Sequence, residues 1–199
     1  MSRRRRLDRG GVVEAAARLV DQEGVDALSL ARLSRELGVQ PPSLYNHVEG
    51  LGGLMRELAL LNLRQMAHAL TAAAIGKAGP EAVMAVAQAY RDYIKAHPGV
   101  YMAGLRYAAG QPGDQELHDL EQQVVDVALA VVASFGLTGD DALHAVRGLR
   151  SVVHGFATLE IAGGFGLSLD CDESFRRLVQ IFYRGLENTV EEGHPLSAR

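Results

Sequence analysis

Two consecutive prolines near the N-terminus constrain the local fold of this 199-residue chain most strongly. They lie in the stretch LGVQPPSLYNHVEG, residues 37–50. A proline fits the first positions of an α-helix, where its missing N–H group has no helical partner, and it disrupts a helix interior. Pro41 and Pro42 therefore predict the start of a short helix, with Gln40 as its N-cap and a turn at Gly38 before it.

This short helix is expected to bury one edge and to display the other. Leu44 and Val48 are four residues apart, so they fall on one face of the helix and point inward. The polar residues Ser43, Asn46 and His47 share the outer face. A short helix with a polar outer face is suited to contact a partner.

Two further helices are predicted ahead of the prolines. Apolar residues recur at helical spacing over about residues 8–23, and Gly24 suits the turn that ends this helix. Ser29 is expected to cap a second helix, which ends at Gly38. A helix, a turn and a second short helix form the helix-turn-helix pattern, whose second helix fits the major groove of B-DNA, about 12 Å wide.

The residues expected to meet DNA divide by their chemistry. Glutamine and asparagine can pair bidentately with adenine, and a proline ring can contact the methyl group of thymine. The candidate base-reading residues are Gln40, Pro41, Pro42, Ser43 and Asn46. Tyr45 and His47 are placed to bind phosphate groups, which fix the register without reading the sequence.

The charge distribution supports a nucleic-acid partner, although the net charge is −4. Residues 1–50 carry eight arginines against seven acidic residues, whereas residues 51–199 carry twelve basic and seventeen acidic residues. A basic end on an acidic body suggests that this end meets a polyanion. The run Arg3, Arg4, Arg5 and Arg6 is expected to bind phosphates or to enter the minor groove, with an affinity that falls as salt rises.

The rest of the chain is also predicted to be helical, because glycine- and proline-containing breaks separate stretches with helical spacing. These helices are expected over about residues 51–74, 81–96, 100–109, 117–131 and 140–162, and from residue 172 onward. The predicted fold class is all-α with about nine helices. A three-helix DNA-binding domain is predicted for residues 1–50, with a basic arm at 1–9, and a helical body for residues 51–199, with its first helix as connector.

Signatures of catalysis and of metal binding are absent from the sequence. The seven histidines include no pair three or four residues apart, so none forms a local helical metal clamp. Cys171 lies between two aspartates, whose charges disfavour a reactive thiolate, and Asp172 is expected to be the N-cap of the last helix. A single cysteine indicates a reducing compartment, and no apolar stretch approaches the roughly 20 residues that span a bilayer. A cytoplasmic protein without cofactor, metal, enzymatic activity or membrane partner is expected.

Residues 15–50, AAARLVDQEGVDALSLARLSRELGVQPPSLYNHVEG, resemble the N-terminal domain of the TetR family of bacterial transcriptional regulators. The common features are the alanine-rich first helix, EG at 23–24, LS at 28–29, LGV at 37–39 and LYNHV at 44–48. The resemblance implies DNA contacts from Ser29, Arg32, Gln40, Pro41, Pro42, Ser43, Tyr45, Asn46 and His47. The sequence departs from the family at Leu51, where a lysine usually opens the fourth helix and binds phosphate.

The body resembles a TetR C-terminal subtype named after a Trp-His-Gly signature. The matching sequences are AYRDYIKAHPGVYMAGLR and LRSVVHGFATLEIAGGFGLSLDCDESFRRLVQIFYRGLE; Arg150 lies near the place of the tryptophan, whereas His154 and Gly155 remain. The resemblance implies a body that binds a small effector and dimerises through its last two helices. The candidate effector-binding residues are Met66, Tyr90, Tyr93, Met102, Arg150 and His154. The candidate dimer-interface residues are Leu143, Val146, Val153, Phe175, Val179 and Phe182.

The sequence therefore predicts a homodimeric repressor that binds a palindromic double-stranded DNA operator and is released by a small-molecule effector. Two alternatives stay open. One is a regulator of the same fold that activates transcription or answers no ligand. The other is a helical small-molecule-binding protein or enzyme without specific DNA binding, an alternative that Leu51, the two prolines and the net charge of −4 support.

Overall fold

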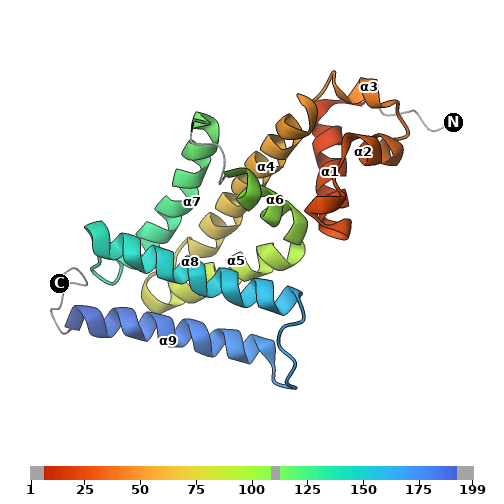
Figure 1. The fold of residues 1–199 in the computed structure, drawn as a ribbon. Helices are drawn as coiled ribbons and strands as arrows, with labels where there is room; N and C mark the ends of the chain where they lie inside the picture. The colour runs from red at the N-terminus through yellow and green to blue at the C-terminus, as the bar shows by residue number, and fades with distance from the viewer. Residues whose placement is uncertain (1–6, 109–112, 192–199) are drawn as a thin grey trace. The chain divides into compact units, whose positions relative to one another are not determined.

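The computed structural model describes residues 7–108 and 113–191, without the side chains of residues 189–191. Within these ranges the protein consists of nine α-helices and one short 3-10 helix, with no strand, which confirms the all-α prediction (Figure 1). The helices form two compact units. The first comprises Met1–Arg64 with His97–His118, and the second comprises Gln65–Ala96 with Asp119–Arg199.

The first unit is held together by one apolar core. Its elements are α1 (Arg9–Glu23), the 3-10 helix η1 (Val25–Ala27), α2 (Leu30–Leu37), α3 (Pro41–Leu44), the first part of α4 (Gly50–Ala74) and α6 (Pro98–Ala108). Each α-helix contributes a side chain with no exposed surface, namely Val12, Leu33, Leu44, Leu58 and Ala103. Burying a Val or Leu side chain contributes about 1.5–3 kcal/mol. Leu44 therefore anchors the short α3 to its neighbours.

Helix α6 begins directly against the end of α1. The carboxylate of Asp21, in α1, accepts hydrogen bonds from the backbone N–H groups of Gly99 and of the following residue, at 2.8 and 2.9 Å. These groups belong to the first turn of α6 and have no helical partner, so Asp21 caps this helix from another element. A Cβ atom at Gly99 would lie 1.9 Å from the carbonyl oxygen of Val20, so the crossing requires glycine.

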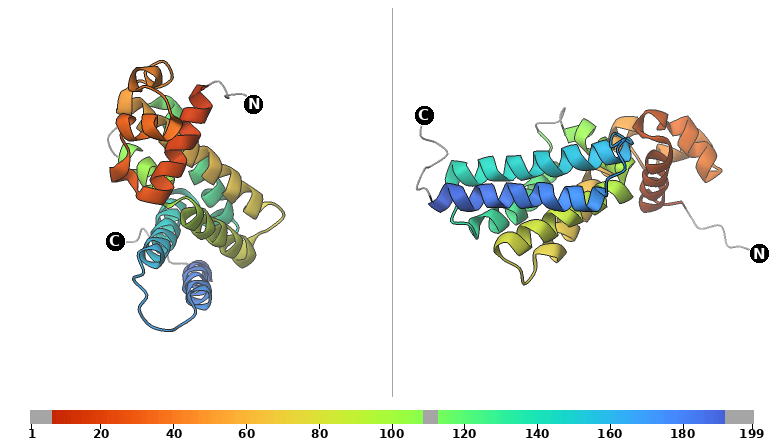
Figure 2. Two further views of the ribbon diagram at one scale, coloured as in Figure 1. Left: turned by 90° about the vertical axis from the view of Figure 1, so that its right-hand side faces the viewer. Right: turned by 90° about the horizontal axis from the view of Figure 1, so that it is seen from below.

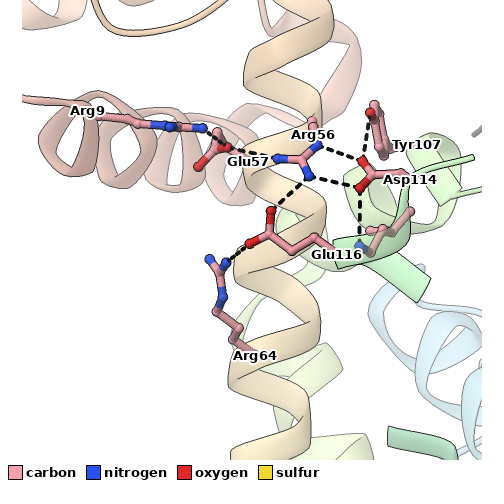
Figure 3. Close-up of polar contacts among 8 residues, drawn as sticks. Arg9, Arg56, Glu57, Arg64, Tyr107, Asp114 and Glu116 are labelled. Atoms are coloured by element: carbon pink, nitrogen blue, oxygen red, sulfur yellow. Dashed lines mark hydrogen bonds and ion pairs between the residues drawn. The ribbon is translucent and has the colours of Figure 1, made fainter. Parts of the chain in front are cut away.

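A cluster of ion pairs joins α4 to the start of α7 (Gln115–Ala133), as Figure 3 shows. The guanidinium of Arg56 donates to both carboxylate oxygens of Asp114, at 2.6 and 2.8 Å, and to Glu116 at 2.8 Å. Glu116 also accepts a hydrogen bond from Arg64, farther along α4, at 2.6 Å. The hydrogen bonds from Arg56 lower the pKa of the Asp114 carboxyl group, so this carboxylate stays ionised to a lower pH than an ordinary aspartate.

The second unit contains the rest of α4, α5 (Gly79–Ala96), most of α7, α8 (Gly139–Ile161) and α9 (Cys171–Glu191). Helices α8 and α9 run side by side in opposite directions, and α5 packs against both (Figures 1 and 2). Val132, Ala145 and Leu186 belong to a buried cluster that α7, α8 and α9 share. The last two helices are therefore partly covered within the single chain.

A buried arginine joins α5, α8 and α9. The side chain of Arg91 is 1% exposed, and its Cζ atom lies 5.4 and 4.9 Å from the ring centroids of Phe156 and Phe175. Its guanidinium donates to both carboxylate oxygens of Glu160, at 2.8 and 2.7 Å, and pairs with Asp172 at 2.8 Å. A buried charge is tolerated when it is paired and hydrogen-bonded, so Glu160 makes the burial of Arg91 possible.

Helix bounds agree with the predicted ones to within two residues, with one exception, and one predicted cap is also wrong. Helix α3 ends at Leu44 and continues as a turn, whereas the predicted helix included His47. Helix α9 begins at Cys171, and the side chain of Asp170, not Asp172, accepts a hydrogen bond from a backbone N–H group at its start, at 2.8 Å. An aspartate lies on each side of Cys171, so residue type and spacing do not show which of the two aspartates caps the helix.

Candidate nucleic-acid interface

Two short loops position α2 and α3. The hydroxyl of Ser29 accepts a hydrogen bond from the N–H group of Arg32 at 3.1 Å, which confirms Ser29 as the N-cap of α2. Gly38 ends α2 with φ 65° and ψ 32°, a left-handed conformation that glycine adopts without strain. The two prolines then occupy the first two positions of α3, with Gln40 as the N-cap, as predicted.

The predicted base-reading and phosphate-binding side chains gather at α3 and the turn after it. Those that are exposed or partly exposed are Gln40, Pro41, Pro42, Ser43, Tyr45, Asn46 and His47. Tyr45 is the most open of the large side chains here, with 62% of its surface exposed. Among the described residues, no group hydrogen-bonds the side-chain amide of Gln40 or Asn46, so both amides are available to a partner.

Arg32, a DNA contact implied by the resemblance, is held by two carboxylates. Its guanidinium pairs with Glu23 at the end of α1 and with Glu36 in α2, the latter at 3.2 Å. The hydrogen bond with Glu23, followed by the one with Glu36, raises the pKa of Arg32. A phosphate group would have to displace these carboxylates to bind Arg32.

The first turn of α4 contains no lysine or arginine. The helix begins at Gly50, with φ 68°, and the next residue is Leu51, which is 43% exposed. The first N–H groups of a helix have no helical partner and carry partial positive charge, so they can bind a phosphate group. Phosphate binding at this point therefore depends on backbone groups without help from a charged side chain.

The described N-terminal helices carry a negative formal charge. Residues 7–50 contain four arginines against seven acidic residues, which gives −3. Arg9 forms an ion pair with Glu57 of α4 (Figure 3), so it too is partly neutralised. The predicted contacts Arg3, Arg4, Arg5 and Arg6 lie outside the described residues, and their charges bring residues 1–50 to +1. Attraction to a polyanion therefore depends on this run of arginines.

The expected effector-binding residues divide into a buried and an exposed set. Met66, Tyr90 and Tyr93 are buried in the second unit. Arg150 is exposed on α8, and the partly buried His154 lies one turn farther along. Burial, followed by the positive charge of Arg150, lowers the pKa of the His154 imidazole. This histidine is therefore neutral at physiological pH.

The sixth expected residue, Met102, is in α6 of the first unit and is exposed. The second unit has a partly open cavity of about 250 Å³ at the loop between α8 and α9. Phe165, Leu167 and Cys171 are among its lining residues, and none of the six expected residues lines it. The effector-binding set thus remains a prediction.

Four of the six side chains expected at a dimer interface are already buried inside the single chain. They are Val146, Val153, Phe175 and Val179, none more than 9% exposed. These four have little or no surface left to bury against a partner, whereas Leu143 is exposed and Phe182 is partly exposed. Ile181, which was not among the expected interface residues, is 71% exposed on α9. Its signal in the sequence is an apolar residue that falls outside the regular apolar face of its helix.

Among the described residues, no helix is long and apolar enough to cross a membrane. The same residues include no group of three or more His, Cys, Asp or Glu side chains arranged to hold a metal ion.

The chain is similar to bacterial regulators over nearly its whole length. Residues 12–50 match the family described as "Bacterial regulatory proteins, tetR family". Residues 83–182 match the family described as "Tetracyclin repressor-like, C-terminal domain". The chain is 35% identical over 187 residues to the uncharacterized HTH-type transcriptional regulator YobS of Bacillus subtilis (strain 168), which covers 94% of this chain and 96% of that protein.

Solved structures share the fold. A protein of unknown function from Rhodococcus sp. RHA1 superimposes with a TM-score of 0.79 at 23% identity, over 90% of this chain and 95% of that one. A TetR variant from Acinetobacter baumannii AYE in complex with minocycline has a TM-score of 0.69 at 21% identity, over 93% of this chain and 99% of that one. At these identities the likeness concerns the fold alone.

Proposed function

We propose that this chain, which belongs to the TetR family of bacterial transcriptional regulators, is a dimeric repressor. A small molecule would release the repressor from its operator. Membership of the family makes the chain a DNA-binding regulator and not an enzyme. The exposed surface at α3 carries the proposal for this particular chain, because the helix presents apolar rings, the residues next to it present unpartnered amides, and such a helix can enter the major groove.

A two-fold dimer would require an operator with two half-sites. Two α3 helices in a two-fold dimer enter successive major grooves about 34 Å apart, and the DNA site is then a palindrome. We place the interface on the outer surface of α8 and α9, where Leu143, Ile181 and Phe182 have exposed surface in the single chain. The four buried residues of these helices instead support the interface from within the subunit.

The effector is a small molecule bound by the helical body. The TetR variant with the same fold was solved with minocycline, which supports a body able to enclose such a molecule. We keep Met66, Tyr90, Tyr93, Arg150 and His154 of the second unit as the candidate residues, since apolar sites with a few polar groups are the usual ligand sites. The retained His154 and Gly155 support assignment of this body to the Trp-His-Gly subtype, despite Arg150 near the place of the tryptophan.

The contacts of α6 and α4 suggest how effector binding would reach DNA. Asp21 ties the start of α6 to α1, and Arg56 ties α4 to the start of α7, all within the unit that carries α3. A ligand shifts a conformational equilibrium only by its difference in affinity for the two states. An effector that prefers another placement of α6 or α4 would therefore move α3 and change the spacing of the two reading helices.

Fluorescence anisotropy on the DNA upstream of the chain's own gene tests the proposed function. The measurement uses full-length protein, competitor DNA and a salt series, beside a Tyr45→Ala, Asn46→Ala variant. Both side chains are exposed, so the variant should fold normally, which circular dichroism verifies. Binding that survives competitor and collapses in the variant supports α3 as the reader. Equal binding by both proteins would contradict it.

A further inference from the structure

The reading surface at α3 contains no arginine or lysine. Residues 38–48 include neither, so the lack is a property of the sequence as well as of the surface. Arginine or lysine paired with O6 and N7 of guanine is the commonest base-specific contact in the major groove. The surface therefore lacks the group that most often selects a G·C pair.

The two arginines nearest in sequence do not supply the missing contact. They belong to α2, the helix that crosses the DNA backbone in a helix-turn-helix and so faces phosphates. Arg32 is held by Glu23 and Glu36, as described above. The Nε atom of Arg35 donates to the carbonyl of Ala31 in its own helix, at 3.3 Å. Neither guanidinium is positioned on α3, where it could reach a base edge.

The groups that the surface does present are suited to adenine and thymine. The amides of Gln40 and Asn46 can each donate to N7 and accept from N6 of adenine. The rings of Pro41 and Pro42 are exposed beside them and offer apolar surface, which suits the C5-methyl group of thymine. The other polar groups here, the hydroxyl of Ser43 above all, can bond to either kind of pair and discriminate little.

From this combination we infer that the operator half-site has A·T base pairs, and not G·C pairs, at the positions that α3 reads. The inference rests on the proposed DNA-binding function and adds the chemical identity of the bases. Each bidentate amide–adenine contact should favour the A·T pair by roughly 5- to 150-fold in affinity. The preference is set by neutral groups, so it should persist as salt weakens overall binding.

Selection from a randomised DNA duplex library with the full-length protein tests the inference. We expect the selection to enrich a palindrome. Its half-sites should hold A·T pairs at the positions where Gln40→Ala and Asn46→Ala change the selected sequence most. Enrichment of G·C pairs at those positions would overturn the inference and leave DNA binding intact. No enrichment over the input library would overturn the proposed function, and the inference with it.

Three substitutions separate the contributions of the proline and amide contacts once an operator is known. Replacing thymine with deoxyuridine removes only the methyl group and should weaken binding about 4-fold for each methyl contacted. A Pro41→Ser, Pro42→Ser variant, which presents hydroxyl groups in place of the apolar rings, should bind the two duplexes more nearly alike. Wild-type protein that binds the two duplexes equally would overturn the proline assignment. Gln40→Arg should move the preference at one position in each half-site to G·C, and an unchanged preference would overturn the role of Gln40.

Discussion

Replacing Glu160 with glutamine should destabilise the protein by about 3 kcal/mol at pH 7. The Glu160 side chain is 14% exposed and accepts hydrogen bonds from Arg91 at 2.8 and 2.7 Å and from Lys95 at 2.7 Å. The bonds from Arg91, and then that from Lys95, lower the pKa of Glu160 from 4.5 to about 2. This difference corresponds to about 3 kcal/mol of stabilisation by the ionised carboxylate. Removing one partner of a buried pair costs a similar amount, about 3–5 kcal/mol.

The cost of Glu160→Gln should decrease at acidic pH. The pKa of Glu160 is lower in the folded than in the unfolded protein, so its stabilising effect is complete above about pH 5 and is lost as the pH falls toward 2. The difference in unfolding free energy between wild type and variant should therefore be constant from about pH 5.5 to 8. It should fall to about half near pH 3.

Urea denaturation at one fixed protein concentration measures this difference, because dimerisation would make the apparent stability concentration-dependent. Glu173→Gln is the matched control. The pKa of Glu173 is also about 2, owing to hydrogen bonds from Arg176 and Arg177, but its side chain is 40% exposed and water screens the pairs. The control should change stability little at any pH. Equal losses in the two variants, or a loss in Glu160→Gln that does not vary with pH, would refute the reasoning.

Three further perturbations have expected outcomes. Gly99→Ala should cost about 3 kcal/mol or more in urea denaturation, because its Cβ would overlap the backbone oxygen of Val20, 1.9 Å away. Asp21→Ala should cost about 1–2 kcal/mol in the same assay, because it removes the acceptor that caps α6; a change below about 0.3 kcal/mol would argue against the cap. Replacing Arg3–Arg6 with alanine should reduce the slope of log affinity against log salt by about 3 to 4 for each subunit of the dimer in anisotropy titrations, without changing the preferred operator.

Local signals made the geometry around α3 predictable. Ser29, Gly38 and the two prolines each act within a few residues, through a capping bond, a left-handed turn or a missing N–H group. Such devices depend on chain neighbours alone, so they can be recognised without knowledge of the tertiary structure. The placement of the reading side chains on one exposed surface followed from these devices.

Long-range contacts could not be predicted in the same way. Asp21 and Gly99 are 78 residues apart, and Arg56 and Asp114 are 58 apart, so no spacing rule connects them. The apolar face of α9 was recognised, but a sequence pattern does not say what covers such a face. Phe175 and its neighbours pack within the subunit, and only the structure distinguishes them from the exposed Ile181.

The charge distribution implies that different parts of the N-terminal domain hold DNA and read it. Phosphate contacts supply affinity for any sequence, whereas base contacts supply discrimination. Residues 7–50 have a formal charge of −3, and both Arg9 and Arg32 are paired with carboxylates, so the helices themselves attract random DNA weakly. Weak general attraction leaves the neutral contacts of α3 a larger share of the total binding energy. We therefore expect the ratio of specific to non-specific affinity to be higher than a cationic reading helix would give, and the arginine run to set the overall affinity without altering that ratio.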